Sequence, residues 1–195
     1  MKLLLVTAPT KEPIDLPEAK GHLRVDVSDD DEYITSLIVV AREHIEDITR
    51  RALLTQTWDY SLDGWPAYNC ITLPHGNLVS VTSVKWKDTT GVEATLTLTT
   101  DYLVEPNGES CGRIVLPYGG LWPTGTLYPS NPITIRYVCG WTSPATVPNK
   151  IKAAILMTVA KLYESRGEDT VGQTVHEDKT VRNLLASERL WNELT

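Results

Sequence analysis

Residues 135–167, IRYVCGWTSPATVPNKIKAAILMTVAKLYESRG, join a strand to a helix and decide how the rest of the chain is arranged. Apolar and polar residues alternate up to Cys139, which is the period of a half-buried strand. A loop with two prolines follows, and the helix is expected to begin at Pro148, since proline is well tolerated in a first turn. Gly167 is expected to end it. The helix is apolar on almost every side, so it needs more than one apolar neighbour.

This helix, expected over 148–165, carries two apolar stripes beside a narrow polar side. The first stripe consists of Ile151, Ala154, Ile155, Thr158, Val159 and Leu162. The second stripe consists of Ala153, Leu156, Met157, Ala160 and Tyr163. A helix near the N-terminus can cover one stripe. For the other, two coverings stay open: an adjacent subunit or the terminal helix, and the remainder of the same folded chain.

Two helices are predicted before the central region. Asp15 and Glu18 have capping-box spacing at the start of a short helix within 14–24. Ser28 is the expected cap of a longer helix over 29–51, where four acidic residues crowd the positive end of the helix dipole. Apolar residues then recur at three- and four-residue steps, so this helix has one face for the core.

The C-terminal region combines a polar segment and a short apolar helix. Residues 168–179 are polar and are predicted to form a flexible tether. A last helix is predicted over 180–193, and its apolar residues are Val181, Leu184, Leu185, Leu190 and Trp191. Such a helix suits insertion into the groove of a partner.

From Gln56 onward the hydrophobic period changes from about 3.6 residues to 2. About seven short strands follow at regular spacing. Asp88 to Gly91 is the expected turn of a hairpin, and residues 117–132, rich in proline and glycine, are expected to form a long loop. This pattern predicts a small antiparallel β-sandwich or barrel.

The predicted fold class is therefore α+β: a helical bundle formed by N- and C-terminal helices, with a small antiparallel β domain inserted between them. The expected parts are N-terminal helices, an inserted β domain, a core helix and a tether with a C-terminal helix, over residues 1–53, 54–140, 141–167 and 168–195.

Composition and charge exclude several classes of function. A net charge of −7 argues against general affinity for a nucleic-acid backbone or an anionic membrane. The apolar run Leu3 to Val6 is too short for a signal-peptide core, and no stretch approaches the roughly 20 apolar residues that span a bilayer. Cys70, Cys111 and Cys139 are odd in number and widely separated, so they are interpreted as reduced thiols.

Motifs that carry chemistry are missing from the sequence. The acidic run from Asp26 lacks the glycine and the final glutamate of a calcium loop, so it is interpreted as a helix start. No two of the four histidines have metal-ligand spacing. No nucleophile elbow and no phosphate-binding glycine loop occurs. We therefore predict no catalytic residue, no metal site and no cofactor.

Six tryptophans and no phenylalanine are an unusual aromatic composition. Trp65, Trp122 and Trp141 lie beside proline, glycine or serine in predicted loops. They could form a sugar-binding platform, but plugging the ends of a small β core or anchoring a protein contact is favoured.

Taken in order along the chain, several segments resemble tailed-phage head–tail connector proteins of the phiE125 gp8-like group, which is related to the gp6-like connectors. The resemblance covers nearly the whole chain, and it is carried by LLLVTAPTKEPIDLPEAKGHLRVDVSDDDEYITSLIVVAREHIEDITRRAL, TQTWDYSLDGWP, ITLPHGNLVSVTSVKWKD, GRIVLPYGGLWP, the stretch quoted above and VRNLLASERLW. The chain departs from the group at Ser187 to Arg189, where a Pro-Tyr-Arg pattern is common.

The resemblance implies a virion component without enzymatic activity. Such proteins form a ring, dodecameric by this resemblance, under the portal protein in the neck of the particle. They extend the channel for the passing genomic DNA without binding it specifically, and they provide the attachment site for stopper or tail-completion proteins. Synthesis in the cytoplasm of the bacterial host and no membrane partner are implied as well.

Two sets of contact residues follow from combining the resemblance with the apolar patterns. The predicted portal-binding residues are Val181, Leu184, Leu185, Arg189, Leu190 and Trp191. The predicted subunit-interface residues are Ala153, Leu156, Met157, Ala160 and Tyr163. Two functions from other classes stay open: a carbohydrate- or receptor-binding β module, and a hydrolase with its site in the 117–132 loop.

Overall fold

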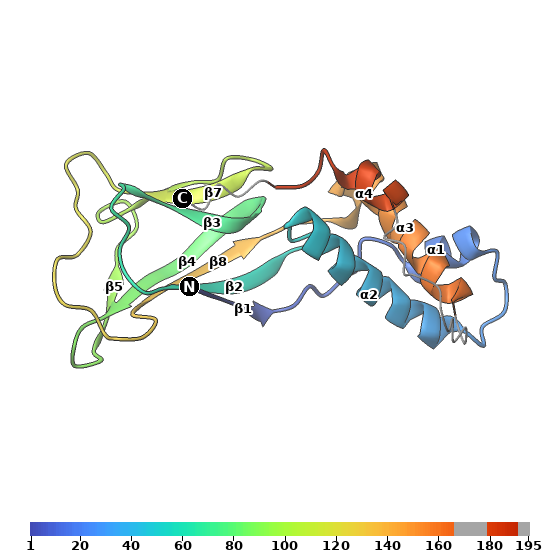
Figure 1. Ribbon diagram of the computed structural model, residues 1–195, viewed down its shortest axis with the longest axis horizontal. Coiled ribbons are helices and arrows are strands. Elements are labelled where there is room, and N and C mark those ends of the chain that lie inside the picture. Colours follow the sequence, from blue (N-terminus) through green and yellow to red (C-terminus); the bar gives the residue numbers. More distant parts are fainter. Residues whose placement is uncertain (166–178, 191–195) are drawn as a thin grey trace. The chain divides into compact units, whose positions relative to one another are not determined.

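The computed structural model describes residues 1–165 and 179–190 (Figure 1). The chain divides into two compact units, and both are assembled from segments distant in sequence. The β unit comprises Met1–Pro9, Thr55–Gly140 and Leu190–Thr195, and the helical unit comprises Thr10–Leu54 and Trp141–Arg189. The fold is α+β, as predicted, with antiparallel sheets in one unit and the α-helices in the other.

The larger sheet of the β unit has five strands in the order β1-β2-β8-β4-β5, and each neighbouring pair is antiparallel. Their bounds are β1 Lys2–Thr7, β2 Gln56–Leu62, β4 Leu78–Lys87, β5 Glu93–Leu96 and β8 Ile133–Cys139. Strand β8 is central, and its alternate residues Ile133, Ile135, Tyr137 and Cys139 are each fully buried. The segment whose alternation predicts a half-buried strand is thus the middle strand of this sheet (Figure 1).

The smaller sheet has three antiparallel strands in the order β3-β7-β6, with bounds β3 Cys70–Gly76, β6 Leu103–Glu105 and β7 Cys111–Val115. It lies against the larger sheet at two points. The hydroxyl of Tyr137 on β8 donates a hydrogen bond to the carbonyl of Pro74 at 3.0 Å. A Cβ on Gly112 would lie 2.4 Å from Cδ2 of Leu78, so only glycine allows this approach.

The helical unit contains α1 Leu16–Leu23, α2 Asp31–Thr49, α3 Asn149–Glu164 and α4 Lys179–Leu185, with a short 3₁₀ turn at Pro144–Thr146. Helices α2 and α3 lie side by side (Figure 1) and bury a shared core. Its fully buried members include Ile34, Ala41, Ile45, Ile151, Ala154, Ile155 and Val159. The first stripe of α3 therefore faces α2 and the core; Leu162 is half-buried and packs against this core, and Thr158 is half-buried.

The N-terminal segment differs from the expectation. The sequence predicts N-terminal helices over residues 1–53, but Lys2–Thr7 forms β1 and pairs with β2 from Lys2↔Ser61 to Thr7↔Thr57. The run Leu3 to Val6 is apolar without alternation, and a short run of this kind does not distinguish strand from helix. The pairing partner, which lies more than fifty residues later, determines the strand.

Two helix ends differ as well. Ser28 does not cap α2: its carbonyl accepts from the amide of Asp31 at 3.1 Å, which makes a turn, and the helix begins at Asp31 with Asp30 as the cap. Helix α4 ends at Leu185 instead of 193, because tight turns follow in which Glu188 N donates to the Leu185 carbonyl at 2.9 Å. The remainder of the predicted helix, from residue 191, lies outside the described residues.

Candidate functional site

The second stripe of α3 lies at the margin of the helical core. Ala153 is exposed, while Leu156, Met157, Ala160 and Tyr163 are half-buried. Leu156, Met157 and Tyr163 pack with part of their surface against the helical core. The chain therefore covers much of this stripe itself. What stays accessible is Ala153 and the outer part of its neighbours, a narrower surface than the sequence suggested.

Tyr163 is held within the chain at the last turn of α3. Its hydroxyl donates a hydrogen bond to Oδ2 of Asp30 at 2.6 Å, and its ring lies 6.1 Å from the ring of Tyr33. Asp30 and Tyr33 flank the start of α2, so these contacts tie the end of one core helix to the beginning of the other. Tyr163 therefore serves the fold whether or not it also meets a neighbouring subunit.

Helix α4 carries three of the residues predicted to bind a portal protein, Val181, Leu184 and Leu185. The helix lies against α3. Val181 is 4% exposed and Leu185 is fully buried, while Leu184 is half-buried against the same core. Arg189 and Leu190 are half-buried, and Trp191 lies outside the described residues. The inner face of α4 thus fixes this helix to its own chain, and the residues that follow it carry the remaining part of the predicted site.

Arg51 fixes the turn that follows α4, and sequence reasoning did not identify it. Its Nε donates to the Glu188 carbonyl at 2.6 Å, and its guanidinium lies 5.8 Å from the centre of the Trp141 ring. Lys150 Nζ also donates to Ser187 Oγ at 3.1 Å and lies 3.6 Å from a carboxylate oxygen of Glu188. No local pattern indicates a contact across so long a separation in sequence.

A second arginine, Arg42, is buried on α2 among carboxylates. Its side chain is 7% exposed; Nε donates to Glu12 at 2.8 Å and Nη1 donates to Glu46 at 2.6 Å. Burial alone would lower the pKa of Arg42, but Glu46 and Glu12 raise it above its ordinary value. Burial raises the pKa of Glu12, and Arg42 only partly offsets this. The group is a structural ion-pair network, because every named charge has a partner.

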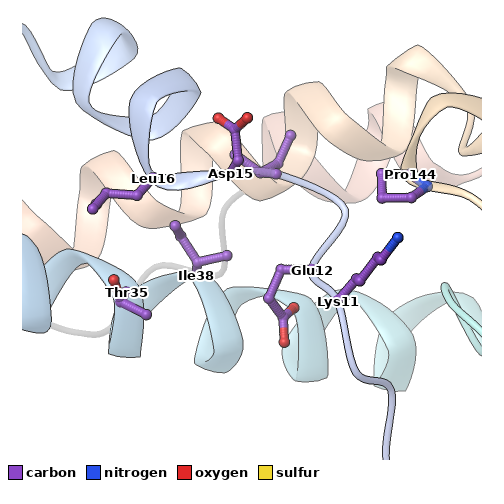
Figure 2. Close-up of a pocket in the computed structure, with 8 residues that line it drawn as sticks. Lys11, Glu12, Asp15, Leu16, Thr35, Ile38 and Pro144 are labelled. Atoms are coloured by element: carbon purple, nitrogen blue, oxygen red, sulfur yellow. The ribbon is translucent and has the colours of Figure 1, made fainter.

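A pocket of about 350 Å³ opens between α2 and the segment before α1, and its walls are mainly apolar (Figure 2). Ile38 points from α2 toward that segment, whereas the Asp15 carboxylate points away from α2. Asp15 caps α1 by accepting from the amide of Glu18 at 2.8 Å, and Glu12 holds Arg42. Both carboxylates at the pocket are therefore engaged in holding the fold, and their arrangement gives no pair for acid–base chemistry.

The loop tryptophans have structural positions. Trp65 and Trp122 stack on each other with ring centres 4.9 Å apart and planes at 4°, and Trp122 Nε1 donates to the Tyr68 carbonyl at 2.9 Å. Trp141 is 8% exposed and belongs to the helical core. Trp141 thus packs in the helical core and not at an end of the β core, while Trp65 and Trp122 form a half-buried stacked pair within the β unit.

Within residues 1–165 and 179–190, no group of three or more histidine, cysteine, aspartate or glutamate side chains could hold a metal ion. Within the same ranges no helix has the length and apolar character needed to cross a membrane. Cys70 and Cys111 are half-buried and Cys139 is buried, and no disulfide joins any two of them.

A family model and several solved structures match this chain. Residues 13–103, just under half of the chain, match the family described as phage gp6-like head–tail connector protein. Across all of this chain and 98% of the matched one, the fold is similar to a protein in the neck of an empty GTA particle computed with C6 symmetry (TM-score 0.80, 24% identity). No curated protein matches the chain.

Two further structures agree with that likeness, again over all of this chain and 98% of the other. One is from the virion of a native gene transfer agent (GTA) particle, with a TM-score of 0.78 and 24% identity. The other is from the neck of a native GTA particle computed with C12 symmetry, with a TM-score of 0.74 and 23% identity. At these identities the likeness shows the fold, and it includes both the helices and the sheets.

Proposed function

We propose that this chain, a head–tail connector protein of the phage gp6-like family by the match over residues 13–103, is a structural component of the neck of a phage or phage-like particle. The observation that carries the proposal is the similarity of fold along the whole chain to a protein of a GTA neck. A non-enzymatic role fits the two buried arginines of the described residues, because Arg42 is paired with Glu46 and Arg51 donates to the Glu188 carbonyl, so both serve the fold.

In the proposed particle, twelve copies form a ring under the portal protein. The symmetries of the similar neck structures, C6 and C12, support a cyclic arrangement. The ring extends the DNA channel and gives the stopper or tail-completion proteins a place to attach. The net charge of −7 suits a channel through which DNA slides, because acidic residues outnumber the lysines and arginines that could hold phosphates.

The proposed portal contact is the chain from α4 to the C-terminus. Val181 and Leu185, and in part Leu184, form its base on α3. The proposed contact residues after this base are Arg189, Leu190 and Trp191, of which Trp191 lies outside the described residues. Arg51 supports this division, because its bond to the Glu188 carbonyl fixes the residue just before these contact residues. The portal protein would thus meet a short segment at the end of a fixed helix.

The proposed lateral contact in the helical unit is the accessible part of the second stripe of α3. Ala153 is its exposed N-terminal end, and the accessible parts of Leu156, Met157 and Ala160 follow it along the helix. Tyr163 contributes at the edge of the stripe through the part of its ring that the core leaves accessible. Small and apolar residues at such a position suit close approach by a neighbouring subunit.

Deleting the gene from the genome that encodes the particle tests the proposed function. The chain is expected in purified particles, and its deletion is expected to give DNA-packaging heads that lack tails. Electron microscopy of particles from the deletion strain, with the gene supplied in trans as the control, is the measurement. Normal tailed particles from the deletion strain would refute a role in the neck.

A further inference from the structure

Strand β1 has an unusual surface for the edge of a sheet. One side of β1 pairs with β2, and none of the described strands pairs with its other side. All six of its residues are exposed, and the exposed fractions of Leu3, Leu4, Leu5 and Val6 lie between 37% and 50%. Both faces of β1 therefore present aliphatic side chains to solvent beside a row of unpaired backbone groups.

Protein edges of this kind are normally protected against pairing with other chains by charges, prolines or short length. The edges of the smaller sheet follow this rule: β3 contains Pro74, and β6 has three residues. Strand β1 carries a single charged side chain, Lys2, and no proline. Its exposed edge is thus suited to pairing with another strand.

We infer that the free edge of β1 pairs with the free edge of β5 in the next copy of this chain. The inference rests on the proposed ring. In a ring with cyclic symmetry each contact joins two different surfaces, whereas β1 against β1 would close a two-fold pair. Strand β5 is the other edge of the same sheet, and its residues Glu93, Ala94 and Thr95 are exposed. It is short, but its one charge, Glu93, is already paired with Lys85 and Lys87 of β4, so it opposes the pairing less than an unpaired charge would.

The pairing continues the five-stranded sheet from one copy to the next. Each copy offers β1 to one neighbour and β5 to the other, so one contact type serves the whole ring. The backbone groups of β1 gain partners, and its exposed leucines lie across from the side chains of β5. The partner of this surface is therefore a second copy of this chain.

Cross-linking between cysteines tests the pairing. In a background with Cys70→Ser and Cys111→Ser, the double variant Leu4→Cys, Thr95→Cys is oxidised and separated on a non-reducing gel. A ladder of covalent multimers is expected, and the single variants Leu4→Cys and Thr95→Cys are expected to stay monomeric on the same gel. A dimer from Leu4→Cys alone would show β1 against β1 and overturn the inference, as would a double variant without a ladder.

Hydrogen exchange on the unmodified chain gives a second measurement that does not depend on the variants. The amides of residues 2–7 are expected to exchange at least tenfold more slowly in the assembled ring than in the dilute chain. A ring with unchanged exchange at these amides overturns the strand pairing and leaves the neck role intact. A chain that stays monomeric at every concentration also overturns the pairing of β1 with β5. The gene deletion then tests the role in the neck separately.

Discussion

Arg42 is a buried charge whose removal should be costly at the scale of a single residue. Replacing it with methionine keeps much of the volume but leaves Glu12 and Glu46 without their cation. Breaking a buried pair by removing one partner costs about 3 kcal/mol, because the remaining charge is poorly solvated. We expect Arg42→Met to lower the free energy of unfolding by that amount in urea denaturation.

The control for this prediction is Glu43→Gln. The Glu43 side chain is 63% exposed, and its contact with Arg42 is long, at 3.4 Å. Its removal is therefore expected to change the free energy of unfolding by less than about 0.5 kcal/mol. Equal losses from the two variants would contradict the view that burial makes the Arg42 network important.

Asp88 gives a pH-dependent contribution within the turn between β4 and β5. Its Oδ1 accepts from the Thr90 hydroxyl at 2.6 Å, the Thr90 amide at 2.8 Å and the Val92 amide at 3.0 Å. The Thr90 hydroxyl first, and then the backbone amides, lower the pKa of Asp88 below its ordinary value of 3.8. A lowered pKa in the folded state stabilises the turn above 3.8, and this stabilisation is lost as the pH falls through the lowered pKa.

We expect the amide resonances of Thr90 and Val92 to titrate with a midpoint below pH 3.8 in NMR spectra. The Asp88→Asn variant should show no such titration, because the amide cannot ionise. A midpoint at or above the ordinary value would mean that the turn does not favour the ionised carboxylate.

At the scale of elements, Gly112 sets the distance between the two sheets. A methyl group there would lie 2.4 Å from Cδ2 and 2.5 Å from Cβ of Leu78, so the strands would have to separate. Such overpacking costs about 1–3 kcal/mol. We expect Gly112→Ala to destabilise the chain by about 2 kcal/mol in denaturant unfolding.

Gly21→Ala is the matched control, since the same methyl group is added on α1 where nothing lies within 4 Å. Alanine favours a helix over glycine by up to about 1 kcal/mol, so this variant should be more stable than the natural chain. If both variants destabilise to the same extent, the contact between the sheets is not the cause.

The C-terminal segment leads to a truncation test that follows from the burial along α4. Removing residues 189–195 should abolish binding to the portal protein of the same particle in a pull-down, with an unchanged melting temperature. Removing 179–195 should in addition destabilise the chain by at least about 3 kcal/mol, because Val181 and Leu185 leave the core. Portal binding by the chain that lacks only residues 189–195 would exclude these residues as the contact.

The elements that the sequence predicted well are those with a strong local pattern. The capping box starting at Asp15, the stripes of 29–51 and 148–165, and the alternation in β8 each report burial through nearby residues. Strand β1 and the end of α4 depend on distant partners, β2 for the former and Arg51 for the latter. Local periodicity carries no information about such distant partners. For the same reason it shows which site residues are apolar but not how far the chain itself buries them.

For the site this difference means that types of residue were easier to predict than their accessibility. The second stripe of α3 is apolar as read from the sequence, yet contact between Tyr163 and Asp30 shows that part of it serves the fold. Val181 and Leu185 are likewise apolar residues that the core of their own chain buries. A sequence pattern shows that a side chain needs covering, but the fold decides how much of that covering the chain itself supplies.

At the scale of the whole molecule, Ala153 provides a test of lateral assembly. Ala153→Glu places a charge on the exposed N-terminal end of the second stripe, and it should leave the unfolding curve unchanged while reducing ring formation at least tenfold. Native mass spectrometry gives the distribution of oligomers. Lys161→Glu on the exposed polar side of α3 is the control and should assemble like the natural chain, so an equal loss there would indicate a general charge effect.

The division of the helical unit between Thr10–Leu54 and Trp141–Arg189 has a consequence for synthesis on the ribosome. Helix α2 emerges early, but α3, which covers Ile34, Ala41 and Ile45, is not translated until the whole β insertion has been made. During that interval the apolar face of α2 is uncovered, so a chaperone that holds nascent chains can bind it. Slow translation of the insertion would lengthen this vulnerable period, so codon choice between Thr55 and Gly140 would influence how much protein reaches the assembling particle.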